Sequence, residues 1–175
     1  AMLDLETKES KKQKQTAIYK SHQDLLSEVF DYIWLSGQWN DGMTDIFRQI
    51  LLSPTVDSLA QQLVVSAITL GAMNLFDFNK FRLLVDVYRE SSDEQVRQRA
   101  LVGWVLSIGK DRYILYPEQK TLVDELLQSD AVCEELVELQ MQLVYCANAE
   151  SDNHTIQREI MPDILKHNNF NVTLN

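Results

Sequence analysis

The chain has 175 residues, of which 45% are hydrophobic and 24% are charged, with five Gly and three Pro. This composition excludes a disordered chain and disfavours a turn-rich β-sandwich, and no apolar run approaches the roughly 18 residues that a membrane-spanning helix needs. Residues 21–175 hold 11 basic and 23 acidic groups, a net charge of −12, whereas residues 1–20 hold five Lys and three acids. A body of this charge repels phosphate backbones, so we expect neither nucleic-acid binding nor membrane insertion.

Residues 1–17 form a basic N-terminal stretch that we expect to precede the folded part. The first two residues, Ala-Met, are typical of a vector remnant, which leaves open whether a native leader stood there. We predict a single helical domain over residues 18–168 and a tail over 169–175. The tail has apolar residues at the place where the terminal repeat of an array needs a polar face. This pattern indicates a chain cut from a longer array.

The sequence repeats itself at an interval of 38 residues. Segments that begin at Ser53, Ser91 and Ser129 align without gaps. Their small and apolar residues share columns such as Leu63, Leu101 and Leu139; Gly71, Gly109 and Ala147; and Leu84, Leu122 and Ile160. One interval earlier, the columns of Leu63, Ala67, Ile68, Leu84 and Tyr88 hold Leu25, Val29, Phe30, Ile46 and Ile50. We therefore predict four units, near residues 15–52, 53–90, 91–128 and 129–167.

Helical spacing of apolar residues predicts two helices in each unit. The first helices are expected near residues 18–36, 56–74, 93–110 and 131–148, and the second near 41–52, 79–90, 117–128 and 155–167. Helix-start signals support these boundaries. They are Ser53 before Pro54, Ser92 with Gln95, Ser129 or Asp130, and the shared column of Asp41, Asn79, Pro117 and Thr155. Pro162 predicts a kink or an early end in the last helix.

The segment over 93–110 illustrates the predicted packing. Its apolar residues form a buried stripe that comprises Val96, Ala100, Leu101, Trp104, Val105 and Ile108. Arg97 and Arg99 flank that stripe, and we expect them to be solvated or paired with acids.

The run over residues 93–101, DEQVRQRAL, resembles the HEAT-repeat pattern, in which an acidic start precedes Val-Arg and a small residue. The interval is close to the period of HEAT repeats and differs from the shorter period of tetratricopeptide repeats. The chain also resembles a segment of large bacterial proteins that combine the two repeat types. The resemblance implies an all-α fold, which we expect to be a right-handed superhelix (solenoid) of about four HEAT-like helix pairs. It also implies a protein-binding scaffold whose second helices line the concave side, without catalytic residues.

The second helices carry a charged column of Arg82, Lys120 and Arg158, each one repeat interval after the last. Four residues further on are Asp86, Asp124 and Pro162. Residues four apart share one side of a helix, so we predict the ion pairs Arg82–Asp86 and Lys120–Asp124. Two interpretations remain open: a structural ladder that spaces the units, or a charged groove that orients a partner segment.

Aromatic residues gather at the junctions inside the units. Phe78 and Tyr116 share a column just before a second helix, and a hydrophobic staple explains them. We expect Trp39 to be an exposed anchor for a partner, because aromatic side chains dominate interface hot spots.

No spacing typical of a metal site, a phosphate-binding loop or a catalytic nucleophile occurs in the sequence. We therefore predict no catalytic, cofactor-binding or metal-binding residues. Cys133 and Cys146 lie on one expected helix, at a spacing that puts them on different faces. We interpret them as reduced core thiols of a cytoplasmic protein.

The predicted function is that of a non-enzymatic protein-interaction or scaffolding module, a fragment of a larger repeat protein. Its expected partners are a protein or peptide and the flanking repeats of the same full-length chain. The site residues that we predict are Trp39, Arg82, Asp86, Lys120, Asp124 and Arg158. One alternative is a self-assembly module that stacks through open solenoid ends. Another, disfavoured by the acidic body, is a HEAT-like nucleic-acid-binding or glycosylase-type protein.

Overall fold

A computed structural model of the chain describes residues 8–155 and residue 158. Within these residues it contains seven α-helices, one short 3-10 helix and no strand, which confirms the all-α prediction. The elements are α1 (Lys8–Leu35), α2 (Asp41–Leu52), α3 (Ser58–Asn74), α4 (Phe78–Glu90), α5 (Glu94–Leu106), η1 (Lys110–Arg112), α6 (Pro117–Leu126) and α7 (Asp130–Thr155). The chain divides into two compact units, residues 1–121 and residues 122–175.

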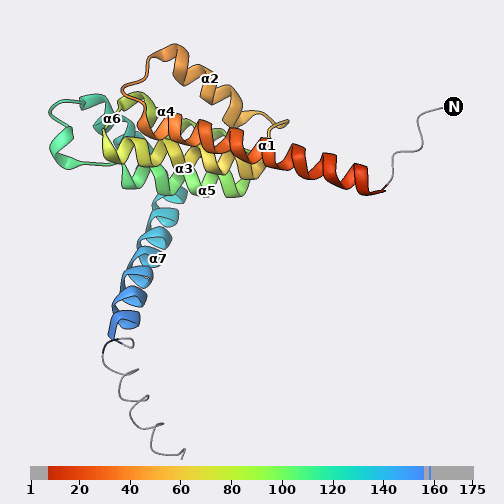
Figure 1. Ribbon diagram of the computed structural model, residues 1–175. Helices are drawn as coiled ribbons and strands as arrows, with labels where there is room; N and C mark the ends of the chain where they lie inside the picture. The colour runs from red at the N-terminus through yellow and green to blue at the C-terminus, as the bar shows by residue number, and fades with distance from the viewer. Residues whose placement is uncertain (1–7, 156–157, 159–175) are drawn as a thin grey trace, which may run out of the picture. The chain divides into compact units, whose positions relative to one another are not determined.

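In the first compact unit, successive first helices lie side by side (Figure 1). Helix α3 packs between α1 and α5, while α4 packs against α2 and also against α3 and α5. The first helices α1, α3 and α5 therefore contact one another in succession, and the second helices α2 and α4 do the same. This packing is compatible with a helical repeat.

The boundaries of α2 and α4 agree with the predicted second helices to within one residue. Helix α1 instead begins ten residues before the predicted start, so the basic stretch is largely helical. Helix α5 ends at Leu106 rather than near 110, and the buried Ser107 caps it by donating from both its amide and its hydroxyl to the carbonyl oxygen of Gly103. Helix α7 continues to Thr155, where we expected a second helix to begin; the rest of that expected helix lies outside the described residues, except Arg158, which is exposed.

The helix caps differ from the expected ones by one to four residues. Asp57, not Ser53, caps α3 by accepting the amide of Ala60, and Asp93, not Ser92, caps α5. Helices α2 and α4 are capped by Asn40 and Asp77, each one or two residues before the predicted column. In each case a side-chain carbonyl or carboxylate oxygen accepts a first-turn amide, which is the interaction that decides an N-cap.

The hydrophobic staple at the start of α4 is formed by Phe76 and Phe81 and not by the expected Phe78. Phe76 lies just before the cap and its ring centroid is 6.2 Å from that of Phe81 in the second turn. Tyr116 packs edge-on against Phe76 at 4.9 Å, while Phe78 opens the helix half-buried. Aromatic packing at this junction is confirmed, but Phe76 takes the role that we assigned to Phe78.

The core of the first compact unit comes from the apolar sides of all its α-helices. Its fully buried side chains include Ile33, Val65, Ile68, Phe81, Leu83, Leu84, Val85, Val87, Val96 and Ala100. Four residues of the stripe that we predicted on α5 are buried, with Leu101 and Trp104 completing the set. Arg97 is acid-paired as expected, with its Nε 3.0 Å from Glu94, and Arg99 donates to the hydroxyl of Ser66 at 2.9 Å.

Hydrogen bonds between neighbouring helix pairs join residues that are about one period apart. The backbone N–H of Trp39 donates to Asp77, 38 residues further on, at 2.7 Å. The side chain of Gln62 donates to Gln95, 33 residues further on, at 2.9 Å. These separations are compatible with the repeat interval seen in the sequence.

In the second compact unit, Cys133 and Cys146 both lie on α7 and are free thiols. The thiol of Cys133 is 3.5 Å from the carbonyl oxygen of Leu127, and its side chain is half-buried. Cys146 is exposed, as is every residue from 140 to 149, so the expectation that it is a core thiol was wrong. An apolar residue on a helix becomes core only where a second element covers it.

Candidate interaction surface

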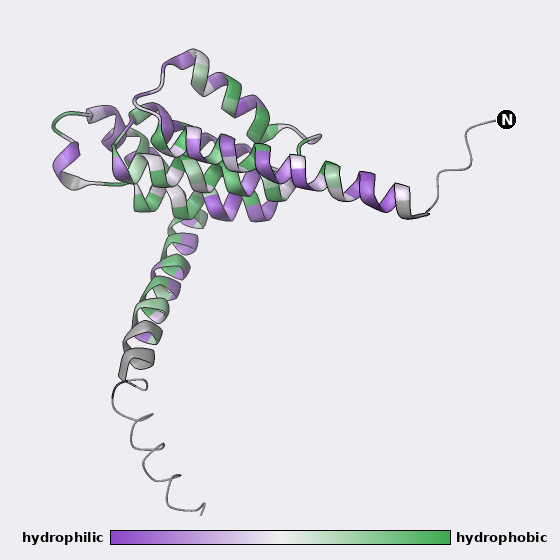
Figure 2. Ribbon diagram, viewed as in Figure 1, coloured by the Kyte–Doolittle hydropathy of each residue, from purple (hydrophilic) through white to green (hydrophobic). Residues whose placement is uncertain are grey.

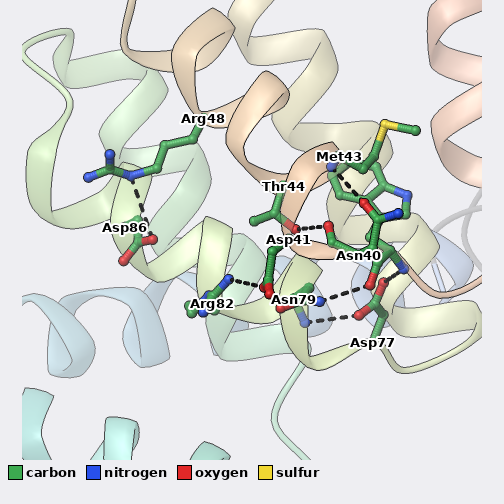
Figure 3. A network of polar contacts seen from close by, with 10 residues as sticks. Asn40, Asp41, Met43, Thr44, Arg48, Asp77, Asn79, Arg82 and Asp86 are labelled. Atoms are coloured by element: carbon green, nitrogen blue, oxygen red, sulfur yellow. Dashed lines mark hydrogen bonds and ion pairs between the residues drawn. The ribbon is translucent and has the colours of Figure 1, made fainter.

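The charged column of the second helices forms a surface between α2 and α4 (Figure 3). Arg82 of α4 lies 3.1 Å from Asp41 at the start of α2. Arg48 of α2 lies 3.7 Å from Asp86 and also donates two hydrogen bonds to Glu90. We call these five residues the α2–α4 charged face.

The predicted ion pair Arg82–Asp86 is replaced by pairs between helices. Because α2 runs beside α4, Asp41 reaches Arg82 while Arg48 reaches Asp86. Arg82 still lowers the pKa of Asp86 electrostatically, as a minor contribution. The charges therefore connect neighbouring helix pairs, which supports the ladder interpretation without excluding the groove.

Asp41, Arg48 and Glu90 were not among the predicted site residues. A signal for one of them exists in the sequence, since Arg48 and Asp86 are one repeat interval apart and occupy the same column with opposite charges. Equivalent positions of adjacent repeats lie close together, so opposite charges in one column indicate a pair between repeats.

Lys120, Asp124 and Arg158 are exposed, as a binding role requires. Lys120 belongs to the first compact unit, whereas Asp124 and Arg158 belong to the second. The structure therefore brings Arg82 and Asp86 into one surface and leaves the Lys120–Asp124 pair a prediction.

The ionisation of Asp86 is disfavoured by its surroundings. Burial raises the pKa of Asp86, and the nearby Arg48 only partly offsets this effect. The folded state thus binds the Asp86 proton more tightly than the unfolded chain does, so the ionised carboxylate opposes folding at neutral pH.

We expect Asp86→Asn to be more stable than the wild type at neutral pH, by less than about 1 kcal/mol. The difference in unfolding free energy should shrink as the pH falls from the folded pKa to below the ordinary value of 3.8, because the wild-type carboxyl then becomes protonated in both states. Urea unfolding of both proteins at several pH values measures this difference. A difference that is constant with pH would contradict the assignment.

Trp39 lies beneath this surface and not on it, so the expectation of an exposed anchor was wrong. Its side chain is 7% exposed and stacks on Phe47 of α2 with a centroid distance of 4.7 Å. The indole N–H donates to the hydroxyl of Ser36 at 2.8 Å. The residue is buried because its backbone is also held, through the 2.7 Å hydrogen bond to Asp77 and a 2.8 Å bond from Asn79.

Lys80 completes this buried network and was not singled out by the sequence pattern. It has no exposed area, and its ammonium donates to the carbonyl oxygens of Ser36 and Gly37 at 3.0 and 3.1 Å. These carbonyls follow the C-terminal end of α1, where a cation is favourable. Burial lowers the pKa of Lys80, while the charge of Asp77 opposes that shift. The network therefore fastens the loop after α1 to α4.

Searches of family models, curated proteins and solved structures find no significant match to this chain. Within the residues that the structure describes, no group of three or more His, Cys, Asp or Glu side chains is placed to hold a metal ion. Each described helix is too short or too polar to cross a membrane. What the fold defines is the class: an all-helical protein with packing compatible with a helical repeat.

Proposed function

We propose that the chain is a non-enzymatic protein-interaction or scaffolding module of a larger repeat protein. In this proposal the helix pairs form a right-handed superhelix of about four HEAT-like units. The observation that supports it best is the packing of α1, α3 and α5 in succession, together with the packing of α2 beside α4. Hydrogen bonds from Trp39 to Asp77 and from Gln62 to Gln95 also join residues that are separated by about the repeat interval. Repeat arrays of this kind offer extended surfaces to protein partners.

The α2–α4 charged face is the proposed partner-binding surface. Its side chains remain accessible, from 28% exposed for Asp86 to 84% for Asp41. Cations and anions alternate between the two helices, an arrangement that suits a polar peptide segment with charges of both signs. Lys120, Asp124 and Arg158 remain proposed partner-binding positions on later parts of the chain.

Exchanging the two charges of the Asp41–Arg82 pair distinguishes the two interpretations, a charged groove that orients a partner and a structural ladder that spaces the units. The double variant Asp41→Arg and Arg82→Asp keeps an ion pair between α2 and α4 but reverses the charges that a partner meets. We expect its stability to stay within about 1 kcal/mol of the wild type, as for an exposed pair. Proteins that the wild type captures from a lysate of the source cells should be lost with this variant.

Quantitative mass spectrometry of the captured proteins provides the measurement, with urea unfolding as the check on stability. The single variant Arg82→Asp is the comparison, since it breaks the pair and also alters the surface. Equal capture by the wild type and the double variant would show that the charges only space the helices.

Self-assembly is a second candidate, and one observation favours it. The large apolar side chains Ile18, Tyr19 and Leu25 on α1 are 69%, 63% and 57% exposed. Copies that stack through the ends of their arrays need exposed apolar surface on a terminal helix, and α1 has such a surface.

A further inference from the structure

The N-terminal half of α1 extends past the helices that it packs against. Helix α1 has 28 residues, whereas its neighbour α3 has 17, and Figure 1 shows the surplus at the N-terminal end. Every residue from 11 to 25 is exposed. An isolated helical segment of about 15 residues is marginal in water, so the exposed segment over residues 11–25 would gain stability from a partner.

Large side chains on α1 form a stripe that is exposed except at Val29, which is half-buried. Ile18, His22, Leu25, Val29 and Tyr32 follow one another at intervals of four, three, four and three residues. Such alternating spacing defines the seam of a coiled coil. Ile33, the buried residue of α1, falls outside this series, and Figure 2 shows apolar residues scattered along the otherwise hydrophilic N-terminal half of α1.

The charges of α1 are divided between its two halves. Residues 10–23 contain four Lys and no acid, whereas residues 24–35 contain three acids and no base. The acids, Asp24, Glu28 and Asp31, are exposed like the lysines. A parallel pairing of two such helices would oppose like charges, whereas an antiparallel pairing sets each basic half against an acidic one.

We propose that α1 pairs two copies of this chain as an antiparallel helix pair along this stripe. A two-fold axis between residues 23 and 24 places His22 opposite Leu25 of the second copy and Ile18 opposite its Val29. The same axis superimposes the basic half of each helix on the acidic half of the other. Such an interface is isologous and closes at two copies. The inference rests on the self-assembly candidate and is independent of a partner at the α2–α4 charged face.

Sedimentation equilibrium of the full chain tests the pairing. The mass should rise with concentration from that of a 20.2 kDa monomer towards twice that value. Leu25→Lys, at an exposed position in the middle of the stripe, should weaken dimerisation at least about tenfold. Leu59→Lys is the matched control, because Leu59 is 63% exposed on α3 and should leave the dimer unchanged. Circular dichroism verifies that both variants are folded.

A charge-reversal pair tests the orientation. One variant carries Lys14→Glu and Lys20→Glu, and the other carries Glu28→Lys and Asp31→Lys. Each alone should dimerise more weakly at low salt than the wild type, because the net charge of its basic half is cancelled or that of its acidic half is reversed. A mixture of the two should form mixed dimers.

A monomeric mass at every concentration, a Leu25→Lys dimer as strong as the Leu59→Lys one, or a mixture that fails to associate would overturn the proposal. The capture experiment at the α2–α4 charged face does not depend on any of these results, so the two proposals can fail separately.

Discussion

Replacing Lys80 by alanine is expected to lower the free energy of unfolding by about 3 kcal/mol. The change removes the two hydrogen bonds to the carbonyl oxygens of Ser36 and Gly37 and also the buried alkyl stem. The cation–π contact between the ammonium and the Trp39 ring, at 5.3 Å, is lost as well. Urea unfolding followed by circular dichroism measures the effect.

Lys80→Met separates the hydrogen bonds from the packing, since methionine fills most of the same volume without a donor. We expect this variant to lose about 1–2 kcal/mol, because the two carbonyl oxygens lose their donor. A Met variant as stable as the wild type would show that the buried ammonium makes no net contribution.

The Lys80 comparison also has an expected pH dependence. The folded pKa of Lys80 lies below the ordinary value of 10.5, so the unfolded chain binds this proton more tightly. The charge of Lys80 thus opposes folding at neutral pH, and this opposition fades as the pH rises from the folded pKa to 10.5. The wild type should therefore gain stability relative to Lys80→Met over that range.

Gly103→Ala is the second large effect that we expect, with overpacking that costs about 2 kcal/mol and a net loss of about 1 kcal/mol. A Cβ atom at this position in α5 would overlap the hydroxyl of Thr69 in α3 and would lie 3.2 Å from a methyl group of Leu84 in α4. Alanine gains about 1 kcal/mol over glycine inside a helix, but overpacking of a close helix contact costs about 1–3 kcal/mol. The net loss follows because Thr69 and Leu84 are both buried and have little room to move.

Gly42→Ala provides the matched control for this position. Gly42 lies in the first turn of α2, where a Cβ atom would meet only the side chain of Asn40, at 3.5 Å. This variant should be as stable as the wild type or up to about 1 kcal/mol more stable. Thermal unfolding of both variants decides the matter, and a stabilised Gly103→Ala protein would contradict the close packing of α5 on α3 and α4.

The positions of several helices along the chain could be predicted from the sequence. The second helices over 41–52 and 79–90 are present in the structure, and Val96 and Trp104 of the predicted stripe are buried. The packing of α1, α3 and α5 is compatible with the repeat interval. These features depend on the spacing of apolar residues along one helix, which a sequence records directly. The superhelical path of four units stays a prediction, as does the role of the last helix.

The candidate site was predicted less well. Trp39 was expected on the surface and is buried, and the charges of Arg82 and Asp86 find partners on α2. Helical spacing shows which residues share a face but does not show which neighbouring side chain covers or pairs with them. Lys80 was not predicted to be buried for the same reason. Its burial depends on the loop after α1, whose backbone carbonyl accepts a hydrogen bond from the Lys80 ammonium.

By itself the sequence determined the helical class of the chain, the interval between its helix pairs and the segregation of charge along α1. All three are properties of residue order, because helical periodicity and local charge need no distant contact. Only the tertiary structure decided that Trp39 and Lys80 are interior, that the ion pairs run between α2 and α4, and that most of the stripe on α1 is exposed. Burial and pairing depend on which element lies opposite, and that is settled only when the helices pack together.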